Sequence, residues 1–234
     1  LHHAARGSVP KSIENPRLTN EINVGGFINV LEASNKNMVK RFIYASSSSV
    51  YGDSPELPKV EDKIGKPLSP YAVSKYINEL YAKNFNFNYG IDTIGLRYFN
   101  VFGKNQDPKG AYAAVIPKFI DCFLNLESPT INGNGYNSRD FTYVENVIDA
   151  NIQSILTENK NALNQVYNIA CGKRINLNEL ADLIKKNLTF KVNKIKNINV
   201  QHGAERVGDV LHSLASIQKA KSLLNYNPIV SFND

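Results

Sequence analysis

An alternation of helix-like and strand-like segments between residues 15 and 97 constrains the fold more than any other feature. Residues 15–35 carry apolar side chains at helical spacing, and residues 41–45 favour a strand. A helix is predicted from Ser69 to about Phe85, and residues 93–97 favour the next strand. Strands separated by helices pair in parallel through right-handed crossovers, so the sequence predicts an α/β fold around a parallel sheet.

The helix predicted from Ser69 carries a tyrosine and a lysine four residues apart. Ser69 can cap the free backbone N–H groups, and Pro70 suits the first helical position. Tyr71 and Lys75 then lie on one helical face, where the ammonium can stabilise a phenolate and move the phenol toward a usable base. Ordinary surface pairs share this spacing, so the pair needs support from other residues.

That support lies at the carboxyl ends of the predicted strands, where parallel sheets bind their ligands. The run Ser46 to Ser49 directly follows one strand, and Tyr98-Phe99-Asn100 follows the next. A serine run is also typical of a linker, but here it abuts a strand and a Val-Tyr-Gly turn. Hydroxyl and amide groups are therefore predicted to meet at one edge of the sheet.

The second half of the chain has a mixed pattern. Helices are predicted over 113–124 and 144–156, and a capping box at Asn176 and Glu179 opens another through Leu188. Short strands are expected at 130–132 and 166–170. In the first half, Gly25-Gly26 weakens the helix 15–35 and indicates close backbone packing.

Composition narrows the possible partners. The net charge of +6 suits an anionic partner, but the lysine clusters lack interleaved aromatic residues, so nucleic acid is not expected. The two cysteines and four histidines have no disulfide or metal-site spacing, which predicts no metal and a reducing, cytoplasmic compartment. No apolar run is long enough to cross a bilayer.

With the serine run, Tyr71, Lys75 and Arg97-Tyr98-Phe99-Asn100 in this order, the sequence resembles the extended short-chain dehydrogenases/reductases. Within them it resembles the NAD-dependent nucleotide-sugar epimerases, most closely the UDP-N-acetylglucosamine 4-epimerase group. The resemblance implies a Rossmann-type parallel sheet with a smaller mixed α/β substrate-binding lobe, NAD as cofactor, a UDP-sugar substrate and a homodimer. Dimerisation would use the helices containing Phe27 to Leu31 and Ala72 to Leu80, because apolar residues occupy more of their circumference than one sheet can bury.

The same resemblance implies roles for individual residues. Tyr71 would take the proton from the sugar 4-hydroxyl, Ser47 would hydrogen-bond that oxygen, and Lys75 would hold the nicotinamide ribose, with a transient 4-keto sugar between the two epimers. The positions matching the NAD site are Ala4, Ala5, Asn23, Tyr71, Lys75 and Tyr98. The positions matching the substrate site are Gly7, Ser8, Ser48, Ser49, Asn100, Ala114, Val115, Thr130, Asn132, Arg139, Arg206, Asp209 and Ser213.

The sequence departs from the family in lacking a Gly-x-x-Gly-x-x-Gly loop, which lays the dinucleotide pyrophosphate on a helix start. We therefore expect an incomplete Rossmann sheet, with residues 1–103 as the C-terminal portion of the NAD-binding domain. Residues 104–234 would mostly form the UDP-sugar lobe, interleaved with the remaining Rossmann elements. Expressed alone, the chain is expected neither to bind NAD nor to fold stably.

Substrate choice is predicted from small residues. Related epimerases restricted to plain hexoses carry a tyrosine at the position of Ser213, so serine here, with Gly7-Ser8, indicates room for an acetamido group. UDP-glucuronate and UDP-glucose 4-epimerases remain alternatives, as does a non-catalytic nucleotide-sugar-binding fragment. A dehydratase or decarboxylase is disfavoured because Ser48-Ser49 occupy the place of the carboxylate that those reactions need.

Overall fold

A computed structural model of the chain describes residues 1–109, 114–205 and 211–232. Its central sheet has the order β1-β2-β7, formed by Arg41–Ser47, Asp92–Tyr98 and Gln165–Ile169, and both pairings are parallel. His2 adds a parallel bridge to Tyr44 in β1, through His2 N to Ile43 O at 2.8 Å and Ala45 N to His2 O at 3.0 Å. The predicted α/β fold with a parallel sheet is confirmed.

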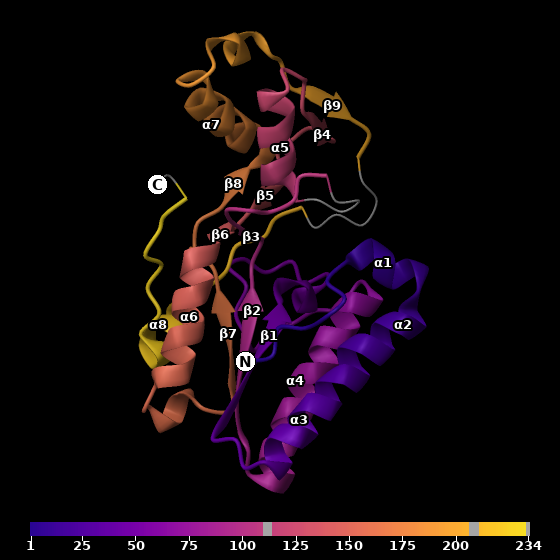
Figure 1. The fold of residues 1–234 in the computed structure, drawn as a ribbon, viewed down its shortest axis with the longest axis vertical. Coiled ribbons are helices and arrows are strands. Elements are labelled where there is room, and N and C mark those ends of the chain that lie inside the picture. Colours follow the sequence, from indigo (N-terminus) through magenta and orange to yellow (C-terminus); the bar gives the residue numbers. More distant parts are fainter. Residues whose placement is uncertain (110–113, 206–210, 233–234) are drawn as a thin grey trace.

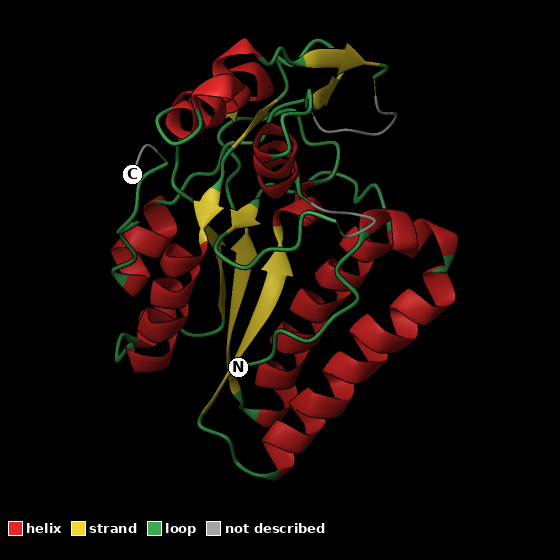
Figure 2. Ribbon diagram, turned by 45° about the horizontal axis from the view of Figure 1, so that its top comes forward, coloured by secondary structure: helices red, strands yellow, loops and turns green. Residues whose placement is uncertain are grey.

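Helices cover both faces of this sheet (Figures 1 and 2). On one face, α3 (Gly26–Lys36) and α4 (Pro70–Tyr89) lie side by side and bury Phe27 and Leu31 against Phe42 and Tyr44. On the other face, α6 (Val144–Leu156) and α8 (Gln218–Leu224) pack against the sheet in a second apolar cluster. Burial on both faces explains the near-continuous apolar strands.

The helical segment before β1 is not a single regular helix. It consists of α1 (Val9–Glu14), α2 (Pro16–Asn20), the π-helical turn η1 (Glu21–Gly25) and α3. A Cβ atom added at Gly25 or Gly26 would meet no atom of a neighbouring element within 4 Å, so the expected close backbone packing there is wrong. Gly25 instead ends the π-helical turn, which inserts an additional residue into the helix, and Gly26 begins α3.

A smaller lobe lies beyond the carboxyl ends of the strands (Figure 1). Helices α5 (Val115–Leu124) and α7 (Leu177–Thr189) share an apolar cluster there, and the predicted capping box of α7 is present. Three two-stranded pairings complete the lobe and its junction with the sheet. These are β3 (Val101–Phe102) with β6 (Thr142–Tyr143), β4 (Thr130–Asn132) with β9 (Gln201–Gly203), and β5 (Ser138–Arg139) with β8 (Ile175–Asn176).

Single turns η2 (Ser48–Tyr51), η3 (Lys160–Ala162) and η4 (Asn193–Asn197) link the larger elements. Within the described ranges, no helix is long and apolar enough to cross a membrane. Residues after 103 contribute to both parts, because β7, α6 and α8 pack with the sheet. The proposed domain boundary at 103/104 stays a prediction.

Candidate active site

Helix α4 presents the tyrosine and lysine to the end of β1. Its start is capped as predicted, because Ser69 Oγ accepts a hydrogen bond from Ala72 N at 3.1 Å and Pro70 occupies the first turn. One turn after Tyr71, the Lys75 Nζ atom donates to the carbonyl oxygen of Ala45 in β1 at 2.9 Å. Both predicted residues therefore lie at the carboxyl end of the parallel sheet.

The serine run supplies a chain of hydroxyl groups at the same place. Ser47 Oγ accepts hydrogen bonds from Ser49 N at 3.2 Å and from Ser49 Oγ at 2.9 Å. Ser47 also lies close enough to the Tyr71 phenol to lower its pKa. Because Ser49 fills the acceptor side of Ser47 Oγ, the Ser47 hydrogen is available to the phenolic oxygen.

Burial is the main cause of the pKa shifts of Tyr71 and Lys75. It raises the pKa of Tyr71, and the Ser47 hydrogen bond only partly opposes that rise. Burial also lowers the pKa of Lys75 to about 8. The Tyr71 pKa therefore moves away from neutrality in this chain, opposite to the direction predicted from the Tyr-Lys spacing, because loss of water disfavours the phenolate.

Asn23 and Tyr98, which are predicted to line the cofactor, contact the two ends of the loop that holds Ala4 and Ala5. Asn23, in the π-helical turn, accepts from Arg6 N at 2.7 Å and donates to Ser74 Oγ at 3.0 Å, so it ties the loop holding Ala4 and Ala5 to the helix. The Tyr98 hydroxyl lies 3.1 Å from His3 Nε2, at the other end of that loop.

This half of the site fits the nicotinamide and ribose of NAD. The Lys75 ammonium and the Tyr71 phenol are donors at the sheet edge, and Arg6 Nη1 is buried without a hydrogen-bond partner among the described residues. A donor left free in this loop is suited to a polar ligand. The glycine-rich loop that would hold the pyrophosphate is absent from this sequence.

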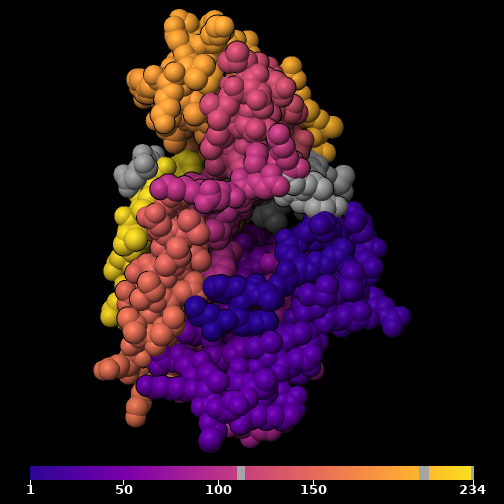
Figure 3. All heavy atoms as spheres, in the orientation of Figure 1, coloured from indigo at the N-terminus to yellow at the C-terminus, as the bar shows by residue number. Residues whose placement is uncertain are grey.

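A cavity of about 700 Å³ lies in the smaller lobe beside α5, with Asn100, which follows β2, on its wall. The space-filling view separately shows a hollow between the lobe and the N-terminal part of the molecule (Figure 3). Helix α5 begins here without a side-chain cap, which suits an anion, and Arg139, whose Nη1 donates to Ser138 O and Leu211 O, also lines the cavity. The predicted substrate residues that line the cavity are Asn100, Ala114, Val115, Thr130, Asn132 and Arg139.

The other predicted substrate residues that the structure describes do not line this cavity. Ser48 and Ser49 form the turn after β1, while Gly7 and Ser8 lie at the start of α1, where Ser8 is the N-cap. Ser213 N donates to Ser138 O at 2.9 Å, beside Arg139. Arg206 and Asp209 lie outside the described residues.

Sequence reasoning missed two features of the site. Lys118 and Cys122 also line the cavity, and their positions four and eight residues after Ala114 on the predicted helix could have identified them. The second feature is Asp140, a fully buried carboxylate that accepts from Cys171 N and Gly172 N at 3.0 Å and from Ala215 N at 3.2 Å.

Asp140 joins the segments that carry the substrate residues. Its backbone oxygen accepts from Asn100 Nδ2 at 2.9 Å, and its carboxylate holds Ala215, two residues after Ser213. Burial raises its pKa to about 6 despite the backbone donors. Across the described parts of the chain, no cluster of His, Cys, Asp or Glu has the arrangement of a metal site.

Comparisons with known proteins agree with this site. Residues 1–170 match the model of the NAD dependent epimerase/dehydratase family. A solved structure of UDP-N-acetylglucosamine 4-epimerase from Methanobrevibacter ruminantium M1, in complex with UDP-N-acetylmuramic acid, is 42% identical with a TM-score of 0.90. The match covers 97% of this chain and 70% of that one.

Two curated relatives carry other substrate names. A putative UDP-glucose 4-epimerase of Methanocaldococcus jannaschii is 42% identical over 224 residues, which is 95% of this chain and 70% of the relative. A UDP-glucuronate 4-epimerase of Thermodesulfobacterium geofontis is 35% identical over 237 residues, covering 100% of this chain and 68% of the relative. The fold, the site and these matches together show that the chain belongs to the NAD-dependent epimerase/dehydratase family.

Proposed function

We propose that the protein containing this chain is an NAD-dependent 4-epimerase of a UDP-hexose, acting on the pair UDP-N-acetylglucosamine and UDP-N-acetylgalactosamine. The observation that carries the proposal is the placement of the Ser47 hydroxyl, the Tyr71 phenol and the Lys75 ammonium together at the carboxyl end of β1. Relatives at 42% and 35% identity that bear UDP-sugar 4-epimerase names support the reaction class.

The side chains of this chain have defined tasks in such a reaction. When bound, NAD supplies the hydride acceptor and donor. Tyr71 accepts the proton of the sugar 4-hydroxyl and returns a proton to that oxygen when the epimer forms. Ser47 hydrogen-bonds the same oxygen and stabilises the Tyr71 phenolate. The positive charge of Lys75 also favours the phenolate, and the Lys75 side chain holds the nicotinamide ribose.

The cavity beside α5 suits the UDP part of the substrate. An uncapped helix start and the Arg139 guanidinium together favour a diphosphate, because a guanidinium forms paired hydrogen bonds to phosphate oxygens. Asn100, Thr130 and Asn132 supply polar groups for the nucleoside. By family resemblance, Arg206 and Asp209 complete the diphosphate and ribose contacts.

The choice of the N-acetylated sugar rests on Ser213 together with Gly7 and Ser8. Ser213 is held to Ser138, next to Arg139, so it lies close to the diphosphate contacts. A Cβ atom at Gly7 would meet nothing within 4 Å, which leaves space at that loop. Small residues at both places are compatible with an acetamido group at the sugar 2-position.

The test compares UDP-N-acetylglucosamine, UDP-glucose and UDP-glucuronate as substrates of the complete gene product and of Ser213→Tyr. We expect kcat/KM of the variant to fall roughly 10- to 100-fold for the acetylated sugar and little for UDP-glucose, because a filled pocket excludes only the larger group. Ser222→Tyr, at an exposed position on α8, is the control.

Equal losses on both substrates, or no wild-type preference for the acetylated sugar, would remove the basis for this substrate. Binding of UDP-sugars without turnover of any would instead favour a non-catalytic nucleotide-sugar-binding protein.

We also propose that the protein is a homodimer through α3 and α4. Val30 of α3 and Val73, Leu80 and Tyr81 of α4 are exposed, on two helices that lie side by side (Figure 1). Exposed apolar side chains on adjacent helices are typical of an interface, and a two-fold axis pairs such a surface with itself.

A further inference from the structure

Three successive turns of α4 hold the carboxyl end of β1. The phenol of Tyr71 lies beside Ser47, Lys75 Nζ donates to Ala45 O, and a carboxylate oxygen of Glu79 accepts from Ser46 Oγ. The helical residues are spaced i, i+4 and i+8, so they lie one above another on a single face. Glu79 has no role in the proposed chemistry, yet it completes this row.

Glu79 is itself held in place by an arginine from the next strand. Arg97 Nε and Nη2, in β2, donate to the two carboxylate oxygens of Glu79 at 2.9 and 2.7 Å. The exposed fractions of the two side chains are only 4% and 6%. The fork-like arrangement fixes both the position and the orientation of the carboxylate, which a single bond to a flexible cation would not.

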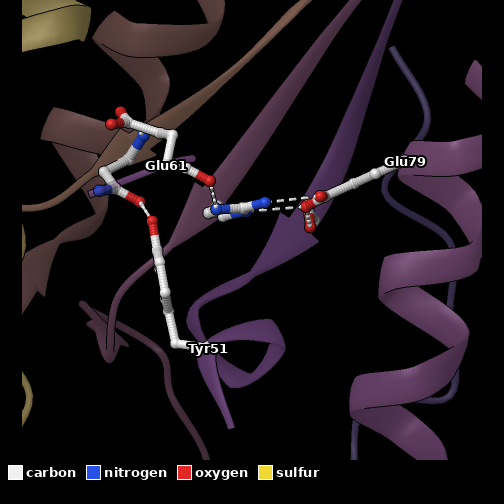
Figure 4. A network of polar contacts seen from close by, with 6 residues as sticks. Tyr51, Glu61 and Glu79 are labelled. Atoms are coloured by element: carbon white, nitrogen blue, oxygen red, sulfur yellow. Dashed lines mark hydrogen bonds and ion pairs between the residues drawn. The ribbon is translucent and has the colours of Figure 1, made fainter. Parts of the chain in front are cut away.

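Arg97 is fixed from its other sides as well, by contacts in the network that joins the labelled residues Tyr51, Glu61 and Glu79 in Figure 4. Its Nη1 atom donates to Glu61 O at 2.8 Å, and its guanidinium carbon lies 4.9 Å from the centre of the Tyr51 ring. Tyr51 in turn donates to Asn168 Oδ1 in β7 at 2.6 Å. The guanidinium is therefore anchored to all three strands of the sheet and to the turn after β1.

A buried ion pair is not explained by stability alone. Replacing such a pair by apolar side chains of similar volume is often neutral or stabilising, because removing two charges from water is costly. The use that is best attested for buried polar pairs is to fix one register between packed elements. Here the elements are the helix that carries Tyr71 and the strand end that carries Ser47.

We propose that Glu79, fixed by Arg97, is a positioning residue that sets the register of α4 on β1 and so the Ser47–Tyr71 hydrogen bond. Ser46 is the residue of β1 that hydrogen-bonds Glu79. The inference rests on the proposed epimerase function only for its turnover readout. Its structural part concerns a hydrogen bond that can be measured without any substrate.

The test removes the hydrogen bond between Ser46 and Glu79 and leaves the ion pair between Glu79 and Arg97. In the complete gene product, Ser46→Ala deletes the bond between Glu79 and β1, and Ser46→Thr restores a hydroxyl. The matched control is Ser154→Ala, which removes an equally buried hydroxyl that bonds only to Ala150 O within α6. The readouts are kcat and KM for the UDP-sugar, and NMR titration of Tyr71 labelled at Cζ in the substrate-free protein.

We expect Ser46→Ala to lower kcat roughly 10- to 100-fold with KM changed less than twofold, since small displacements of reacting groups have effects of this size. The Tyr71 titration should move to higher pH, because the Ser47 bond that favours the phenolate is weakened. Ser46→Thr should recover most of both losses, and Ser154→Ala should show neither.

An unchanged Tyr71 titration in Ser46→Ala would overturn the proposal, whether or not the protein epimerises any sugar. Equal kcat losses in Ser46→Ala and Ser154→Ala would do the same. A shifted Tyr71 titration in a protein without epimerase activity would support the positioning role of Glu79 and contradict only the proposed function.

Discussion

The two faces of α4 reverse the usual polarity of a surface helix. On the face toward the sheet, Lys75 and Glu79 are only 4% and 7% exposed, whereas on the opposite face Val73 and Leu80 are 42% and 50% exposed. Burying charged groups costs free energy, which supports the proposed role of the inner face in binding and chemistry. Exposed apolar groups on the outer face indicate a further protein surface.

The largest expected effect breaks the inner face. Tyr71→Phe removes only the phenolic oxygen, so kcat should fall roughly 10²- to 10⁴-fold, the range typical of a lost general base. Binding of the UDP-sugar, measured by calorimetry, should stay within a few fold. Tyr81→Phe, on the outer face, serves as the matched control and should retain full turnover. Epimerisation at the wild-type rate by Tyr71→Phe would show that Tyr71 is not the base.

The next effect breaks the outer face. Leu80→Arg places a charge in the proposed dimer contact, and two-fold symmetry places a second one close to it. Such like-charge contacts cost several kcal/mol, so the dimer dissociation constant should rise about 100-fold or more. Sedimentation measures the change, with Phe190→Arg at an exposed lobe position as control. A wild-type protein that sediments as a monomer at high concentration contradicts the dimer.

A smaller effect concerns the free-energy cost of burying the Lys75 ammonium on the inner face of α4. Burial lowers the pKa of Lys75 from 10.5 to about 8, a shift worth about 3 kcal/mol at neutral pH. Lys75→Met removes this penalty and loses one hydrogen bond worth about 1 kcal/mol. The free energy of unfolding of the variant should therefore be about 2 kcal/mol higher than that of the wild type at pH 7, while turnover is lost.

The pH dependence of this gain follows from proton linkage. Between about pH 8 and 10.5 the unfolded chain binds a proton at Lys75 that the folded chain has lost. Wild-type stability therefore gains relative to Lys75→Met as the pH rises through this window, and the advantage of the variant disappears above it. Urea unfolding of the cofactor-free complete protein at pH 7 and 10 tests this. A variant less stable than wild type at pH 7 contradicts it.

The two faces also show how far sequence reasoning reaches. Local signals predicted α4 through the Ser69 cap and Pro70, and they predicted the capping box of α7. The meeting of Tyr71 with Ser47 followed from placing strand ends at one edge. Family resemblance, not spacing, assigned Ser213 and Arg139.

The remainder depends on tertiary contacts that no local pattern encodes. The Glu79–Arg97 pair joins residues on a helix and a strand, and Asp140 binds backbone groups of Cys171, Gly172 and Ala215, more than thirty residues away in sequence. The Tyr71 pKa was predicted in the wrong direction because spacing reveals a neighbouring charge but not the loss of water around it. The π-helical turn was missed because glycines also mark close packing.

The most direct test of the 4-epimerase proposal follows the hydrogen atom on sugar carbon 4. The complete gene product, loaded with NAD, is incubated with UDP-N-acetylglucosamine in D₂O, and the products are examined by NMR. We expect UDP-N-acetylgalactosamine without deuterium at carbon 4, because that hydrogen returns to the same carbon while Tyr71 handles only the exchangeable hydroxyl proton. Deuterium at carbon 4, or no interconversion, would contradict the proposal.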